Sequence, residues 1–294
     1  MGDNLNKTAI CILSFNRPNY LEEVLISISK QTTFDKYKYF FYQDGAVNKF
    51  SKIRYTEDKD IENCIQLANK YLPHDTEYAD YSHNIGVALN FDRAENHLFN
   101  VLNYDRIIFL EDDMILNPNY FEMLERLMDK LENTDVAEVT MHGSGSFDLD
   151  KQKKLSNKLM SDIHHHWAYG IYKDKWIKRQ EKLKWYLDII KGIDYRKRPS
   201  KEIIEGYKKR GSIRKESSQD GAKDVAYMEC GLFRINTAIS NAFYIGEIGL
   251  HSRTANYIKQ GWNKDRFIEW DNNIEFDTSN LNELKTRYFK SVKG

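Results

Sequence analysis

The chain has 294 residues, 41% apolar and 30% charged, which is enough to bury a core in one large domain or two modest ones. Its 44 basic and 44 acidic residues cancel, so no nucleic-acid partner is expected, and no apolar run is long enough to cross a membrane. The start lacks the pattern of a signal peptide, and three scattered cysteines argue against a disulfide framework and a zinc site, so we expect a cytoplasmic protein.

The first half alternates short apolar stretches with amphipathic ones. Strands are predicted at 8–15, 37–43, 77–82, 106–110 and 136–143. Helices are predicted from Pro18 with Asn16 as its cap, over 58–72, over 83–102 with Gly86 near its start, and over 117–133 with Pro118 in its first turn. This spacing predicts an α/β fold with a mainly parallel, doubly wound central sheet flanked by helices.

In such sheets ligands bind beyond the carboxyl ends of the strands. Three polar clusters follow predicted strands here. They are Ser14-Phe15-Asn16-Arg17, Gln43-Asp44-Gly45 and Glu111-Asp112-Asp113. We therefore expect them to converge on one crevice.

The second half is less regular. Residues 143–162 read as a loop or lid, 217–233 as a helix, and 240–257 as a strand and a glycine turn. We expect a single unit over 1–270 whose two halves, 1–115 and the more helical 116–270, share a cleft. A helical tail at 271–294 could rest on a membrane surface or pack against the body.

Three adjacent carboxylates at a buried strand end repel one another and lose hydration. A divalent cation compensates them, and Mn²⁺ or Mg²⁺ prefers carboxylate oxygens while keeping waters and substrate phosphates as further ligands. The alternative is that Glu111, Asp112 and Asp113 form an acidic loop before a helix, where carboxylates are also favourable.

The stretch IIFLEDDMIL with its NPNYF tail, following NRPNYLEEVLIS near the N-terminus, resembles glycosyltransferases of the GT-A fold. The nearest resemblance is to the N-acetylglucosaminyltransferase I type and its bacterial relatives, over most of residues 8–255. The resemblance implies a GT-A (Rossmann-like) domain, with a nucleotide-sugar-binding half at 1–115 and an acceptor and catalytic half at 116–270. It also implies a metal-dependent, inverting glycosyltransferase. Such an enzyme moves a sugar, as a hexosyl- or N-acetylhexosaminyltransferase does.

The resemblance also implies roles for residues. Asp113 would ligate Mn²⁺ or Mg²⁺, with His251 of the glycine-rich segment YIGEIGLHS as a second contact to the metal or diphosphate. The donor would be bound by a set drawn from the strand ends and the turn before the next helix: Ser14, Asn16, Arg17, Asp44, Gly86, Glu111 and Asp112. A simple Asp-Gly turn remains the alternative for Asp44, and a hydrogen-bonded turn residue for His251.

An inverting transfer needs a general base near the acceptor hydroxyl. Two candidates remain open. Asp220 fits the family's spacing to Gly246, although Gln219 stands where the family has an aromatic residue. Asp224 fits the local helical pattern better, and helix capping is the alternative for either.

The acceptor cleft is predicted around Trp167 and Gly170, near the run His164-His165-His166, which lines that cleft or is incidental. From Lys173 to Lys215 there are sixteen basic and six acidic residues, a surplus of ten positive charges. This sector suggests contact with phosphates or an anionic surface, and a solvated helical face is the alternative.

We therefore predict an inverting transfer from a UDP-linked sugar to a glycan, on an anionic lipid carrier, in bacterial cell-surface polysaccharide or oligosaccharide synthesis. The alternatives are a sugar nucleotidyltransferase and a non-catalytic glycan-binding protein. SFNRPNYL lacks the glycine-rich basic loop that a nucleotidyltransferase commonly carries after its first strand.

Overall fold

A computed structural model describes residues 8–79, 82–143, 149–161, 167–248, 254–259, 261–262 and 274–294. Eight strands form the central sheet: β1 Thr8–Ser14, β2 Lys38–Gln43, β3 Glu77–Tyr78, β4 Arg106–Glu111, β6 Val136–Thr140, β7 Leu159–Met160, β8 Tyr169–Tyr172 and β9 Phe233–Thr237. Two more, β5 Met114–Leu116 and β10 Ala242–Tyr244, form a small antiparallel sheet.

The central sheet has the order β3-β2-β1-β4-β8-β6-β9-β7. Its pairings are parallel except where β8 lies between β4 and β6 and where β7 pairs with β9. The prediction of a mainly parallel α/β sheet is confirmed. Because β1, β2 and β4 run the same way, their carboxyl ends lie at one edge of the sheet, where the three polar clusters stand.

The helices are α1 Pro18–Ser29, α2 Asp58–Tyr71, α3 Val87–Asn96, α4 Tyr120–Leu131, α5 Leu149–Lys154, α6 Lys173–Ile190, α7 Ser200–Lys209, α8 Gln219–Glu229, α9 Thr254–Lys259 and α10 Leu281–Lys293. Short 3₁₀ turns at Phe34–Lys36 and Tyr195–Lys197 and a π-helical turn at His97–Val101 complete the described elements.

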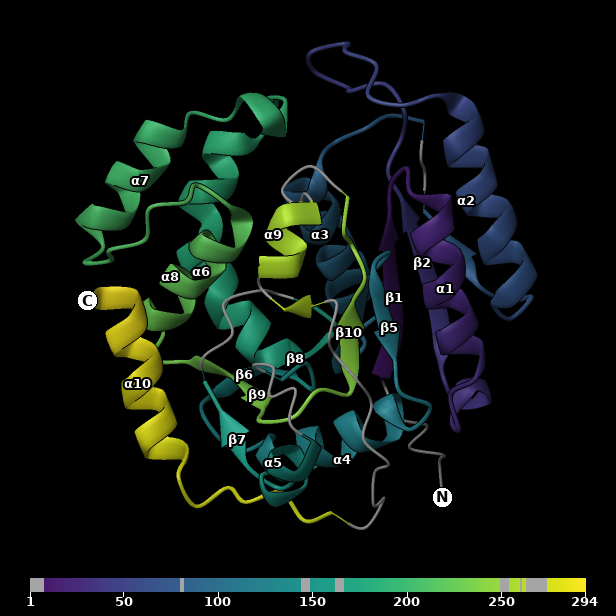
Figure 1. The fold of residues 1–294 in the computed structure, drawn as a ribbon. Coiled ribbons are helices and arrows are strands. Elements are labelled where there is room, and N and C mark those ends of the chain that lie inside the picture. Colours follow the sequence, from purple (N-terminus) through teal and green to yellow (C-terminus); the bar gives the residue numbers. More distant parts are fainter. Residues whose placement is uncertain are drawn as a thin grey trace.

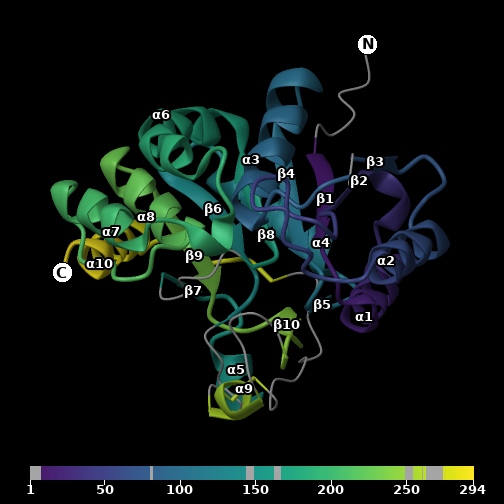
Figure 2. The same ribbon diagram turned by 90° about the horizontal axis from the view of Figure 1, so that it is seen from above.

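Alternation along β1 explains the layers. Ile10 and Ile12 point into a core shared with α1, α2 and α4, while Ala9, Cys11 and Leu13 point into a second core with α3. All five side chains are at most 5% exposed, because helices cover both faces of the sheet. Figure 1 and Figure 2 show α1 and α2 on one side of the molecule and α6, α7, α8 and α10 gathered on the other.

Several boundaries differ from the prediction. Asn16 does not cap α1, since Arg17 holds the N-cap position and no side chain caps the helix. The helix predicted from residue 117 begins at Tyr120, because the backbone of Asn117 bonds instead to Asn241 and Gln31. The predicted 83–102 helix changes to π-helical geometry at His97.

Six elements were not predicted: β5, β7, β8, β9, α5 and α9. The strand predicted within 240–257 is β10. The segment read as a loop or lid contains two of the six, α5 and β7, on either side of residues 155–158. The four unpredicted strands have two to five residues each, and each pairs with a segment distant in the chain. Local pattern alone does not carry that information.

The C-terminal helix α10 packs against the body. Leu284, Tyr288 and Val292 are buried, and the backbone carbonyl of Val292 accepts hydrogen bonds from Ile213 N and Ser212 Oγ. The apolar residues suggested for membrane contact are thus used largely in packing. No helix in the described ranges combines the length and apolar content needed to cross a membrane.

Candidate active site

The three carboxylates lie at the turn between β4 and β5. Glu111 ends β4 and is half-buried, while Asp112 and Asp113 are each 4% exposed. The apolar residues of β4 pair with β1 on one side and β8 on the other, and this pairing carries the turn to the sheet edge. β5 then pairs with β10, which brings residues 242–246 beside the turn.

The Arg17 guanidinium bridges two of the carboxylates. Its Nη2 lies 2.7 Å from Asp113 Oδ2 and also contacts Asp112 Oδ1. Phe15 N donates to the other oxygen of Asp112 at 3.4 Å. Asp112 is therefore held by the loop after β1, whereas the buried Oδ1 of Asp113 has no hydrogen-bond partner among the described residues.

Burial dominates the electrostatics of this turn. It raises the pKa of Asp113 to about 6, although the positive charge of Arg17 opposes the rise. Burial, with the charges of Asp113, Asp220 and Asp112, raises the pKa of Glu111 well above its usual range. One guanidinium offsets only part of the negative charge gathered here.

Residues 244–248 lie against Asp113. Ile245 N donates to the Asp113 carbonyl at 2.9 Å, and a β-carbon at Gly246 would lie 2.6 Å from Asp113 Oδ2. Glycine is thus required for the backbone to approach the carboxylate so closely. Ile248 N donates to the Tyr20 hydroxyl at 3.1 Å, which ties this segment to α1.

Asp113 fits a cation bound mostly by non-protein ligands. Within the part of the chain that the structure describes, no group of three or more His, Cys, Asp or Glu side chains forms a complete metal site. Mg²⁺ and Mn²⁺ are commonly held by one or two carboxylates plus waters and phosphates, and the unpartnered Asp113 Oδ1 can be such a ligand. His251 and residues 164–166 lie outside the described residues.

The end of β2 carries Asp44, whose carboxylate orders a neighbouring turn. Asp44 Oδ1 accepts from Ile85 N at 2.8 Å and Oδ2 from Gly86 N at 3.0 Å, and both Asn84 Nδ2 and Gly45 N add further bonds. Burial raises the pKa of this carboxyl to about 6, and the N–H donors oppose the rise. The structure therefore gives Asp44 a role in shaping residues 84–86, which was not predicted.

The remaining predicted donor residues stand at the same edge. Ser14 is 4% exposed and ends β1, and its carbonyl accepts from Asp44 N at 2.8 Å. Asn16 and Arg17 follow it half-buried, and Gly86 is half-buried at φ +82° immediately before α3. The structure thus brings Ser14, Arg17, Asp44 and Gly86 to the edge that holds Asp113.

The two candidate bases have different surroundings. Asp220 lies in the first turn of α8, half-buried, with no hydrogen bond or ion pair to the described residues, and its charge acts on Glu111. Asp224, one turn later, is 1% exposed and bonds to Arg234 at 2.9 Å, to Tyr288 at 2.8 Å and to Arg214. Of the two candidates, only Asp220 has a carboxylate without a partner among the described residues, and its charge contributes to the raised pKa of Glu111.

The residues predicted for the acceptor cleft separate. Trp167 is half-buried and stacks on Tyr244, with ring centroids 4.2 Å apart. Tyr244 also lies against Gly246, so Trp167 lies near the segment that contacts Asp113. Gly170 lies inside the sheet in β8, paired with Ile108 and Val139, and a β-carbon there would lie 2.2 Å from Met128 Sδ. Its position in the core does not support the prediction that it lines a cleft; it permits helix–sheet packing.

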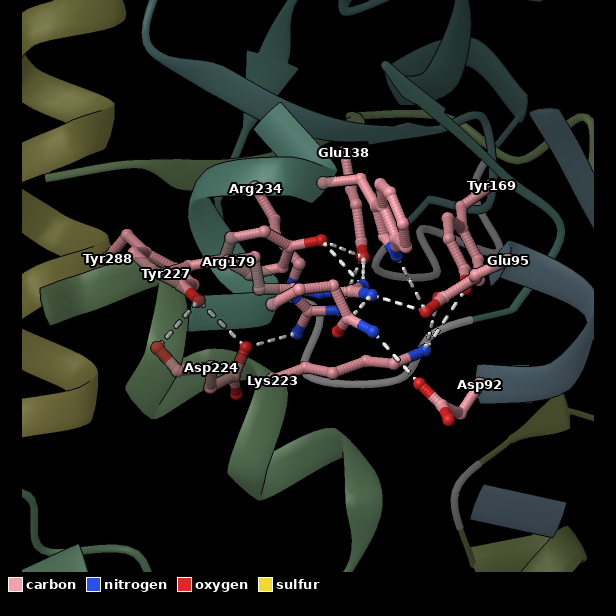
Figure 3. Close-up of polar contacts among 12 residues, drawn as sticks. Asp92, Glu95, Glu138, Tyr169, Arg179, Lys223, Asp224, Tyr227, Arg234 and Tyr288 are labelled. Carbon is pink, nitrogen blue, oxygen red and sulfur yellow. Dashed lines mark hydrogen bonds and ion pairs between the residues drawn. The ribbon is translucent and has the colours of Figure 1, made fainter. Parts of the chain in front are cut away.

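A buried network of charges beside the site was not predicted (Figure 3). Arg179 pairs with Glu95 and lies 3.7 Å from Glu138, and Lys223 Nζ lies 3.3 Å from Glu95 Oε1. Arg234 connects this group to Asp224. All of these side chains are at most 5% exposed. Charged residues on helices normally face solvent, so periodicity gave no signal for it.

Comparisons with known proteins agree with the motif-based resemblance. Over 141 residues the chain is 26% identical to an α-1,3-mannosyl-glycoprotein 2-β-N-acetylglucosaminyltransferase of Arabidopsis thaliana, a match spanning 44% of this chain and 30% of that protein. The chain is therefore similar to the N-acetylglucosaminyltransferase I type, as its motifs predict, but it spans about a third of that relative's length. No family model matches the sequence.

Two solved structures share a weaker likeness. A cytidylyltransferase from Leptospira borgpetersenii serovar Hardjo-bovis has a TM-score of 0.36 and 11% identity, over 60% of this chain and 64% of that one. S. aureus TarS has a TM-score of 0.41 and 12% identity, over 75% of this chain and 33% of that one. Neither TM-score is high enough to add to the assignment.

Proposed function

We propose that this chain is a metal-dependent glycosyltransferase that moves a sugar from a UDP-linked donor to a hydroxyl of a glycan acceptor with inversion. The observation that carries the proposal is the buried acidic turn after β4, where Asp113 has an oxygen without a hydrogen-bond partner among the described residues. The charge of Asp220 acts on Glu111 of the same turn, which makes Asp220 the candidate base. The sequence similarity to an N-acetylglucosaminyltransferase supports the same class of reaction.

In this proposal Asp113 holds Mn²⁺ or Mg²⁺, with His251 as a second contact. The ion, when bound, neutralises charge on the diphosphate leaving group. Arg17 adds a positive charge at the same turn, and Ser14, Asn16, Asp44 and Gly86 form the nucleoside end of the donor site. Glu111 and Asp112 accept hydrogen bonds from hydroxyl groups of the donor.

Asp220 then acts as the general base. Its carboxylate takes the proton from the acceptor hydroxyl as that oxygen attacks the anomeric carbon of the donor sugar. The bond from that carbon to the diphosphate oxygen breaks, and UDP leaves with the electron pair. Attack from the face opposite the leaving group inverts the configuration at that carbon.

Calorimetry with UDP and Mn²⁺ tests the donor site. The wild type should bind UDP more tightly with Mn²⁺ than without it, and Asp113→Ala should lose that metal-dependent gain of about tenfold or more. Glu62→Gln, which changes an exposed carboxylate on α2, is the matched control and should bind as the wild type does. Equal Mn²⁺-dependent binding by Asp113→Ala would remove the metal role.

A screen of nucleotide-sugars for Mn²⁺-dependent UDP release, with anomeric analysis of the product, tests the reaction. Asp220→Asn should keep UDP binding and lose turnover. A retained anomeric configuration would contradict inversion. Synthesis of a nucleotide-sugar from a nucleoside triphosphate and a sugar phosphate would replace the proposal with nucleotidyl transfer.

The acceptor is proposed to be a cell-surface glycan on an anionic lipid carrier. The support is the basic sector from Lys173 to Lys215, where ten basic side chains are exposed: Lys178, Lys182, Lys184, Lys191, Arg196, Lys197, Lys201, Lys208, Lys209 and Lys215. Binding to phosphatidylserine vesicles that disappears at high salt would support a peripheral membrane contact, and equal binding to neutral vesicles would contradict it.

A further inference from the structure

Tyr195 lies between two parts of the site that are distant in sequence. It begins the 3₁₀ turn Tyr195–Lys197 and is 6% exposed. Its ring packs on the turn that Asp44 orders, and its hydroxyl reaches the start of α8. One side chain therefore contacts both the proposed donor loop and the helix that carries Asp220.

On the donor side the contact is close. Gly86 adopts φ +82°, and a β-carbon on it would lie 2.7 Å from Tyr195 Cβ. The same Gly86 donates its N–H to Asp44 Oδ2 at 3.0 Å. A shift of residues 84–86 would therefore push directly on Tyr195, because tightly packed groups transmit displacement.

The residues flanking Tyr195 strengthen this connection. Asp194 Oδ2 accepts hydrogen bonds from Ser51 Oγ at 2.6 Å and from the Tyr55 hydroxyl, both in the loop that follows Asp44. The Arg196 guanidinium lies 3.7 Å from the centroid of the Tyr55 ring. The 194–196 segment is thus fastened to the loop after β2 at several points.

On the catalytic side Tyr195 holds the first turn of α8. Gln219 N, at the first residue of the helix and next to Asp220, donates to the Tyr195 hydroxyl at 2.9 Å. N–H groups in the first turn of a helix have no partner within the helix, so such an external acceptor fixes where the turn lies. Arg198 lies 4.2 Å from the Tyr195 ring centroid and donates to the Ser217 carbonyl at 2.8 Å.

We propose that Tyr195 is a positioning residue that couples occupancy of the donor loop to the placement of Asp220. Nucleotide binding at Asp44 and Gly86 is transmitted through the Tyr195 ring to its hydroxyl and so to the Gln219–Asp220 peptide. This inference rests on the proposed function for the identity of the nucleotide and the role of Asp220. The contacts that carry it are independent of that role.

Hydrogen exchange with UDP and Mn²⁺ tests the coupling without relying on turnover. In the wild type, UDP should slow amide exchange both at residues 84–86 and at residues 217–222. In Tyr195→Phe, which keeps the ring and loses the acceptor, protection should persist at 84–86 and vanish at 217–222. Tyr186→Phe is the matched control: its hydroxyl also bonds to that of Tyr195, at 3.4 Å, but does not touch α8's first N–H.

The outcomes separate the two proposals. Protection of 84–86 alone in the wild type, or unchanged protection of 217–222 in Tyr195→Phe, would overturn the coupling and leave the proposed function standing. No protection of either segment would overturn both. Loss of protection at 217–222 in Tyr186→Phe as well would show that the Tyr195 hydroxyl is not the specific link, which also overturns the coupling.

A kinetic cycle gives a second readout. With Asp220 intact, Tyr195→Phe should lower the turnover rate, measured as UDP release, by about 10- to 100-fold. The reason is that a small misplacement of a reacting group, here Asp220, is costly to catalysis. In an Asp220→Asn background the same change should alter turnover less than about twofold, because the residue that Tyr195 positions is already disabled. An equal loss in both backgrounds would indicate a general structural effect and contradict a positioning role.

Discussion

Asp220 and Asp224 are one helical turn apart on α8, yet only the second is enclosed. α10 places Tyr288 against Asp224, and β9 supplies Arg234, whereas Asp220 stands at the open start of the helix. Removing one member of a buried ion pair leaves an uncompensated charge, while changing a half-exposed carboxylate leaves none. Substitution of Asp224 should therefore reduce stability, whereas substitution of Asp220 should reduce catalysis and leave stability nearly unchanged.

Asp224→Asn should lower the free energy of unfolding by about 3–5 kcal/mol, because Arg234 would lose its nearer buried counter-charge and keep only Glu138, at 3.7 Å. Asp220→Asn should stay within roughly 0.5 kcal/mol of the wild type. Urea denaturation followed by circular dichroism measures both. A stable Asp224→Asn protein would mean that the network does not depend on this carboxylate.

Asp44 gives the protein a pH-dependent stability term. Its pKa in the folded state is about 6, above the ordinary value of an unfolded Asp, because burial penalises the carboxylate. Protonated Asp44 therefore stabilises the folded state relative to the unfolded state. This contribution to the free energy of unfolding is complete below pH ~4 and is lost as the pH rises through about 6. A rise in pKa of this size corresponds to about 3 kcal/mol.

The comparison with Asp44→Asn isolates this term. Asn should be less stable than Asp at pH 4, because its amide N–H₂ faces N–H donors of residues 84–86. That deficit should shrink between pH 4 and 7 as the wild type loses its own contribution. Unfolding free energies measured across this range test it, and a constant difference would contradict the raised pKa.

At the scale of elements, α3, α6 and α8 are joined by charges as well as apolar contacts. Glu95 on α3 meets Arg179 from α6 and Lys223 from α8 (Figure 3). The basic sector is therefore not wholly a solvated face, since Lys175 and Arg179 are buried. Buried pairs are costly to break, so these helices depend on one another.

Glu95→Gln should lower the free energy of unfolding by about 3–5 kcal/mol. Glu95 pairs with both Arg179 and Lys223, so its loss leaves one buried positive charge without a counter-charge. Adding Lys223→Met should recover part of the loss, giving a coupling energy of about 0.5–3 kcal/mol. Lys184→Met, which breaks the exposed pair with Asp188 on α6, should cost less than about 1 kcal/mol. Additive losses in the double variant would contradict direct coupling.

The sequence predicted those elements whose pattern is local. β1, α1, β2, α2, β4 and β6 follow from apolar periodicity, Pro18 and Pro73, and the carboxylate turn follows from a buried strand that ends in charge. β5 pairs with β10 across more than a hundred residues, and only β10 was predicted as a strand, because the three residues of β5 have no local signal of their own. The roles of Tyr195 and of the Glu95 network could not be predicted for the same reason, because their partners are distant in sequence and come into contact only in the folded chain.

At the scale of the whole molecule, α10 closes the side of the sheet that carries β9. Leu284, Tyr288 and Val292 are at most 1% exposed, and Lys285 pairs with Asp135 at the start of β6. The last helix therefore contributes to the core. Figure 1 shows it on the same side of the molecule as α6, α7 and α8. It also completes the surroundings of Asp224 through Tyr288.

Leu284→Ala should lower the free energy of unfolding by about 2–5 kcal/mol, because it leaves a cavity under α10. Asn282→Ala, at an exposed position on the same helix, should have little effect. Urea denaturation of both variants distinguishes a packed helix from one that rests on a membrane. An unaffected Leu284→Ala protein would indicate that α10 leaves the body in solution.

The pairing of β5 with β10 has a consequence for synthesis. Leu116 of β5 pairs with Ala242 of β10, and Gly246 packs against Asp113. The segment that covers the carboxylate turn therefore comes from the second half of the chain. On a ribosome, β4 and its acidic end emerge long before residues 242–246. The nascent polypeptide therefore carries an uncovered acidic turn for much of its translation, and the site is assembled late.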